Sequence, residues 1–157
     1  MRHGPGAFRL AALTGAALAA TLAGGPLGAA EGPEGARVIV QVEGLRNDRG
    51  QVLACLTTQP RRFPDCRADA QARKLSIRAN SATVLDFGPV PDGRYAISLL
   101  HDENGNGKAD MALMIPREGF GFSRNAPVRM GPPSFASAAF AVAGATVRET
   151  IRMRYMF

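Results

Sequence analysis

The sequence predicts an all-β protein, folded as an antiparallel β-sandwich of about seven strands. Its 157 residues include 18 glycines and 11 prolines, and this density of turn-forming residues indicates many short elements. Short segments of alternating apolar and polar residues recur along the chain, which is typical of strands that bury one face. No segment has the sustained three-and-four apolar spacing of an amphipathic helix. These observations favour a sandwich over a helical bundle.

Residues 1–30 are expected to be a secretory signal peptide. Arg2 and Arg9 supply positive charge, residues 10–22 form the apolar segment, and residues 28–30 offer small side chains for cleavage. The apolar segment is too short and too interrupted for a spanning helix, and no later run reaches the roughly 18 apolar residues that one needs. We therefore expect a periplasmic or secreted protein without a transmembrane segment in its mature chain.

The remainder is expected to comprise a short leader, residues 31–36, and one sandwich domain, residues 37–157. Removing the signal peptide takes away two of the 19 basic residues, so the net charge falls from +6 to +4. The other basic residues are spread along the chain and do not form the dense stripe that binds phosphate backbones. The charge therefore argues against nucleic acid and leaves an unknown envelope or extracellular ligand as the expected partner.

The first two strands are expected at residues 37–43 and 51–57. Alternate residues of the first are valine, and the second is a nearly continuous apolar run. Turn-forming residues at 47–50 lie between the two segments, which predicts that they pair as a hairpin.

Further strands follow at similar spacing. They are expected at residues 74–79, 83–87, 94–101, 135–142 and 147–155. The connection at 65–74 can form a helical turn or two. The stretch at about 102–133 is rich in glycine and proline and lacks strand periodicity, and a loop of that length is usually functional or disordered.

Residues 102–110 have the oxygen spacing of an EF-hand loop, D-x-N-x-N-G-x-x-D. The candidate metal ligands are the side chains of Asp102, Asn104, Asn106 and Asp110 and the backbone carbonyl of Lys108. Leu113 stands where an EF-hand has its bidentate glutamate, so we expect a weak Ca²⁺ site with a Kd of about 10⁻⁴ to 10⁻³ M, or one completed by Glu118. The alternative is that the two Asn-Gly pairs are only turn formers.

His101 is the one histidine of the expected mature chain. With a nearby carboxylate, Asp102 or Glu118, it offers the base of a small periplasmic hydrolase. No second histidine for zinc and no nucleophile motif accompanies it. We therefore expect a binding or structural module without catalytic activity, and the hydrolase is the alternative.

Glu118, Phe120 and Phe122 form a possible ligand loop in a glycine-rich segment. Its aromatic rings suit a small binding surface. The alternative is that they fold back over the end of the sandwich and cap its core.

The last expected strand carries a row of arginines, Arg148, Arg152 and Arg154. Such a row can bind an acidic glycan or a lipid head group. Its ordinary explanation is the solvated face of a strand whose other face is buried.

Cys55 and Cys66 are the two cysteines of the chain. An even pair in an exported protein predicts a disulfide. They are eleven residues apart rather than in the Cys-x-x-Cys spacing of redox enzymes, so we expect a structural crosslink that contributes about 3 kcal/mol.

Four segments together resemble a bacterial family, the domain of unknown function 2141 (DUF2141). They lie at residues 91–97, 101–108, 115–123 and 131–135. The resemblance covers the chain from about Arg37 to its end and implies a small secreted β-sandwich, similar to immunoglobulin-like or transthyretin-like domains, with no established biochemical activity. The chain departs from the family pattern at Met114, where glycine is frequent, and at Ala136 and Ser137, where acidic residues are frequent.

Overall fold

The structure is a computed structural model that describes residues 35–82, 84–112 and 115–157. The expected signal peptide, residues 31–34 of the expected leader, and Leu113 and Met114 lie outside the described residues. No helix among the described residues is long and apolar enough to cross a membrane.

One sheet has three strands in the order β10-β1-β4. Its strands are β1 (Ala36–Glu43), β4 (Val84–Val90) and β10 (Val147–Arg152). β1 runs antiparallel to β4 and parallel to β10, with Val38 opposite Val147 and Glu43 opposite Arg152. The central strand therefore has a partner on each side, and β10 is an edge strand.

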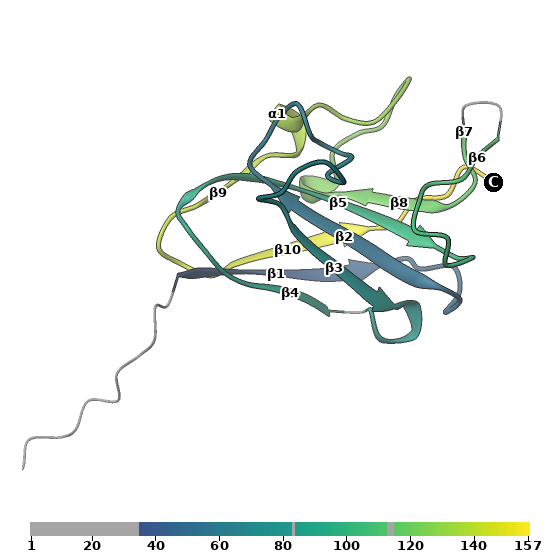
Figure 1. The fold of residues 1–157 in the computed structure, drawn as a ribbon, viewed down its shortest axis with the longest axis horizontal. Helices are drawn as coiled ribbons and strands as arrows, with labels where there is room; N and C mark the ends of the chain where they lie inside the picture. Colours follow the sequence, from purple (N-terminus) through teal and green to yellow (C-terminus); the bar gives the residue numbers. More distant parts are fainter. Residues whose placement is uncertain (1–34, 83, 113–114) are drawn as a thin grey trace, which may run out of the picture. The chain divides into compact units, whose positions relative to one another are not determined.

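The second sheet has five strands, all antiparallel to their neighbours. β3 (Arg73–Arg78), β2 (Gln51–Thr57) and β5 (Gly93–Asp102) are adjacent, and β8 (Gly119–Phe122) and β9 (Phe140–Val142) pair with successive parts of the free side of β5. Figure 1 shows these strands across from β1, β4 and β10.

The remaining elements are short. A two-residue ladder joins β6 (Met111–Ala112) to β7 (Ile115–Pro116). Two 3₁₀ turns, η1 (Ala79–Ser81) and η2 (Ser123–Asn125), and one helical turn, α1 (Phe135–Ala138), complete the description.

The hydrophobic core lies between the two sheets. Along β1, buried residues alternate with more exposed ones, as a strand with one buried face requires. Side chains from both sheets meet in one cluster, whose fully buried large members are Val38, Val40, Val52, Leu56, Leu85, Ile97 and Ile151. The prediction of an all-β sandwich is confirmed.

A second, smaller cluster covers the outer face of the five-stranded sheet. Phe120 and Phe122, each 8% exposed, lie opposite the outward residues of β5 and pack with three alanines. Phe63 lies edge-on to Phe122 and Phe135, with ring centroids 5.8 and 6.1 Å apart. A disulfide between Cys55 and Cys66 joins the segment that carries Phe63 to β2, as the two cysteines predicted.

Several details of the predicted strands are wrong. β1 and β2 do not form a hairpin: β1 already has β4 and β10 on its two sides, and the connection at 44–50 carries the chain to the other sheet. The sandwich is not wholly antiparallel, because β1 and β10 run parallel.

Three segments also differ from the expected elements. The expected strand at 135–142 is a helical turn followed by the short β9, and residues 65–72 form turns rather than a helix. The expected loop at 102–133 contains β8, which alternation between polar and apolar residues cannot reveal because its sequence is Gly-Phe-Gly-Phe.

The glycines of β8 leave room for the last part of the chain. A Cβ on Gly119 would meet the ring of Tyr155 and lie 2.8 Å from its hydroxyl oxygen, and one on Gly121 would lie 2.7 Å from Cγ2 of Ile151. We expect Gly119→Ala to lower the free energy of unfolding by about 1–3 kcal/mol, because overpacking displaces the aromatic ring. Urea unfolding of the variant and the wild type measures this difference.

The matched control is Gly93→Ala in β5, where the new Cβ would lie 3.4 Å from the Tyr95 ring, an ordinary contact. Equal destabilisation by the two substitutions would contradict the packing argument.

Candidate functional site

Asp102 ends β5 and anchors the loop that follows. One carboxylate oxygen accepts from the backbone N–H of Asn106 at 3.0 Å, and the other accepts from that of Gly107 at 2.8 Å. The Gln51 amide also donates to the second oxygen, at 2.8 Å, and Ser76 donates to the amide oxygen of Gln51 at 2.5 Å. The first residue of the motif is thus fixed by two strands of the sheet as well as by its own loop.

The other polar side chains of the motif gather on Asp110. The amides of Asn104 and Asn106 donate to its two carboxylate oxygens at 2.6 and 2.9 Å. Their own oxygens accept from the backbone N–H groups of Asn106 and Lys108, at 3.0 and 2.9 Å. The structure therefore brings the side chains of Asn104, Asn106 and Asp110 together, and it bonds Asp102 to the backbone of the same loop.

Glycine is required at the tip of the loop. Gly105 and Gly107 have φ angles of 73° and 78°, in the left-handed region that other residues rarely adopt. These left-handed residues let the backbone of the loop turn sharply between Asp102 and Asp110.

Glu118 is a buried carboxylate next to this loop, with 5% of its surface exposed. Its two oxygens accept from the backbone N–H groups of Asp110 and Glu103, at 3.1 and 3.2 Å. Burial raises the pKa of Glu118, and the charges of Asp102 and Asp110 raise it further. The protonated form of Glu118 is therefore favoured more than that of an exposed glutamate.

The Asp102 carboxyl has the opposite shift. Burial favours its neutral form, but hydrogen bonds from Gln51 and from the backbone N–H groups of Gly107 and Asn106 outweigh burial and lower its pKa. The group is therefore ionised at neutral pH and is a suitable oxygen ligand. Among the described residues, no group of three or more His, Cys, Asp or Glu side chains is arranged to hold a metal ion. Two of the four candidate side-chain ligands in this loop are amides.

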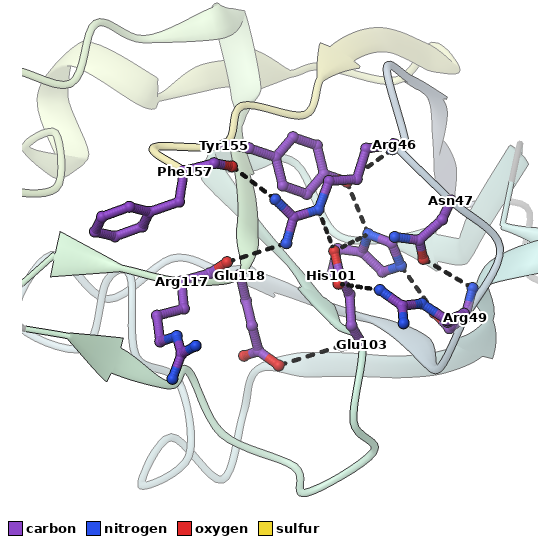
Figure 2. Close-up of polar contacts among 9 residues, drawn as sticks. All are labelled: Arg46, Asn47, Arg49, His101, Glu103, Arg117, Glu118, Tyr155 and Phe157. Atoms are coloured by element: carbon purple, nitrogen blue, oxygen red, sulfur yellow. Dashed lines mark hydrogen bonds and ion pairs between the residues drawn. The ribbon is translucent and has the colours of Figure 1, made fainter.

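A second polar cluster lies at the same end of the sandwich and centres on Arg46 (Figure 2). Its guanidinium donates to Glu103 at 2.6 Å and to the backbone carbonyls of Phe157 and Arg117 at 2.7 and 3.3 Å. It also lies 4.5 Å from the centre of the Tyr155 ring, a cation–π contact. Arg46 thus joins the connection after β1 to the end of β5 and to the last residues of the chain.

His101 is enclosed by this cluster and is fully buried. Its Nε2 lies 2.9 Å from the carbonyl oxygen of Arg49, which can only accept, so Nε2 carries a proton. Nδ1 lies 2.7 Å from the Tyr155 hydroxyl oxygen, and burial raises the pKa of that hydroxyl. Both ring nitrogens are therefore occupied by structural hydrogen bonds.

The hydrolase alternative receives no support from this arrangement. A general base must lie within reach of a substrate, whereas the His101 ring is fully buried and both of its nitrogens already have partners in the protein. Neighbouring residues of a strand point to opposite faces, so Asp102 lies on the outer face of the sheet while His101 faces inward.

Phe120 and Phe122 face the outer cluster rather than solvent, which corresponds to the core-capping alternative. Arg46, Gln51 and Tyr155 were not singled out by the sequence. Each acts through a partner more than 50 residues away, and no local motif marks such contacts.

The comparisons with known proteins give one match. Residues 40–150 match the model of the family DUF2141, which is described as an uncharacterized protein conserved in bacteria. No curated protein and no solved structure matches the chain. The expected likeness to immunoglobulin-like or transthyretin-like domains therefore stays a prediction.

The Arg46–Glu103 contact makes stability depend on pH. The hydrogen bond from Arg46 lowers the pKa of Glu103 in the folded protein, so its stabilising effect is present above the unfolded-state value of 4.5 and is lost as the pH falls through the folded value. We expect Glu103→Gln to cost about 1–3 kcal/mol at pH 7. Urea unfolding of both proteins from pH 7 to pH 3 should show this difference shrink below about pH 4.5.

The control is Glu43→Gln, which changes an exposed carboxylate that faces Arg152 at 3.6 Å. If the stability difference between Glu103→Gln and the wild type stays constant down to pH 3, the Arg46–Glu103 contact is not the cause of that difference.

Proposed function

We propose that this chain, which belongs to the DUF2141 family of bacterial proteins, is an exported β-sandwich module without catalytic activity whose 102–110 loop binds a divalent cation, Ca²⁺ in preference to Mg²⁺. Two sets of contacts carry this proposal: Asn104 and Asn106 are both bonded to Asp110, and Asp102 is bonded to the backbone of Asn106 in the same loop. The cation would order the loop and the end of the sandwich to which it is bonded.

The loop offers the oxygens that Ca²⁺ prefers. Its side chains supply two carboxylates and two amides, and Lys108 adds a backbone carbonyl at the seventh position of the motif. The amide–carboxylate hydrogen bonds within the loop can exchange for bonds to a cation if the two amides turn their oxygens inward. Ca²⁺ tolerates such an irregular set, whereas Mg²⁺ demands an octahedral one.

Glu118 is the further donor nearest to the loop. Its carboxylate is buried, is bonded to the backbone of Asp110, and is repelled by Asp102 and Asp110. It would compensate for the missing glutamate of an EF-hand by its charge, and by direct ligation if its bond to Asp110 opened.

Export is supported by two features of the chain. Residues 1–30 have the composition of a signal peptide, and Cys55 and Cys66 form a disulfide, which persists in oxidising compartments. A periplasmic or secreted location also supplies Ca²⁺ at concentrations that suit a weak site.

Thermal unfolding of the purified, oxidised protein tests cation binding. With a Kd of about 10⁻⁴ to 10⁻³ M, Ca²⁺ at about 10 mM is expected to stabilise the fold by about 1.4–2.7 kcal/mol, and Mg²⁺ by less. Asp110→Asn should abolish most of the Ca²⁺ effect, because it removes one of the two loop carboxylates.

Asp48→Asn is the matched control, since Asp48 is exposed and lies outside the loop. If the melting temperature of the wild type is unchanged up to about 10 mM Ca²⁺, the loop does not bind the cation and is only a turn.

A further inference from the structure

An open cleft of about 450 Å³ lies on the outer face of the three-stranded sheet. It is lined by Glu43, Asn125, Thr150, Arg152 and Arg154. Thr150 and Arg152 alternate with the buried Ile151, and Glu43 stands opposite Arg152 in the ladder. The cleft therefore sits between the exposed side of β10 and the turn η2, remote in sequence from the cation loop.

Arg154 lies in this cleft with its charge uncompensated. Its guanidinium donates to the backbone carbonyls of Asn125 and Ala126, at 3.0 and 3.4 Å. An arginine has five N–H groups, so three remain for another acceptor. Among the described residues, no ion pair neutralises Arg154, whereas Arg152 faces Glu43 at 3.6 Å.

The wall of the cleft is held in a strained conformation. Arg124 and Asn125 have φ angles of 57° and 47°, in the left-handed region, and such strain concentrates at functional sites. The Asn125 side chain donates to the carbonyl of Thr150 and accepts from the N–H of Arg152, both at 2.9 Å. These bonds fix the carbonyls that orient Arg154.

The lining suits a ligand with one negative charge and several hydroxyl groups. Two guanidinium groups and one carboxylate leave a net charge of +1, which a carboxylate would balance and a phosphate dianion would exceed. Planar guanidinium groups bind carboxylates in two-point fashion. Glu43, Thr150 and Asn125 offer acceptors and donors for sugar hydroxyls.

We propose that this cleft binds a monoanionic sugar unit of the hexuronic acid type, with its carboxylate on Arg152 and Arg154 and its hydroxyls on Glu43 and Thr150. The site is separate from the cation loop and does not depend on it. Of the arginine row of the last strand, Arg148 does not line the cleft, so the proposal distinguishes a defined site from a diffuse basic surface.

Isothermal titration calorimetry with glucuronate tests the proposal on the purified protein. Saturable binding is expected for glucuronate, none for glucose, and weaker binding for glucose 6-phosphate and inorganic phosphate. Arg154→Gln and Arg152→Gln should each lower the affinity for glucuronate about tenfold or more, since each removes a charge-assisted contact. Arg148→Gln, on the same face of the same strand, should leave the affinity unchanged.

Arg152 is 71% exposed on its side chain, so its substitution tests the site even if Arg154→Gln perturbs η2. Circular dichroism melts of each variant identify any such perturbation. The proposal is overturned by the lack of saturable glucuronate binding up to about 20 mM. It is also overturned if phosphate binds as tightly as glucuronate, or if Arg148→Gln weakens binding as much as Arg152→Gln.

Discussion

Strand β5 is buried on both of its faces, and the position of the polar groups at this end of the sandwich follows from that burial. Its inward residues fill the core, while its outward residues meet the Phe120 and Phe122 rings at one part and the loop after Asp102 at the other. A strand buried in this way cannot leave a polar group without a partner. His101 and Asp102 therefore each require a complete set of hydrogen bonds, on opposite faces of the sheet.

Those hydrogen bonds come from separate segments, and they tie the loops to the sheet. His101 is bonded to Arg49 and Tyr155, and Asp102 to Gln51 and its own loop. Among the described residues, no buried side-chain nitrogen or oxygen lacks a partner. At the same end of the sandwich, Arg46 holds Glu103 and two backbone carbonyls at once (Figure 2). The candidate cation loop is thus attached to a rigid support.

Alternation predicted the strands that bury one face, such as β1 and β4, because the period of two is a local property. It failed for β8, whose glycines admit Tyr155 and Ile151, and for the order of strands, since the parallel pairing of β1 with β10 joins residues more than 100 positions apart. The residues of the candidate site also fall into two groups, those that a local pattern predicts and those that it does not. Spacing selected Asp102, Asn104, Asn106 and Asp110. Gln51 reaches Asp102 from another strand and is itself held by Ser76, and neither residue carries a local signal.

The side chain of Asn125 has a consequence for the solubility of the protein. An edge strand such as β10 presents unpaired backbone groups, which can recruit a strand from another molecule and start aggregation. The Asn125 amide donates to Thr150 and accepts from Arg152, so it occupies the donor and acceptor sites that an incoming strand would use. One asparagine thereby blocks this part of the edge, and Arg148 and Arg152 beside it add charges that repel a second copy of the same edge.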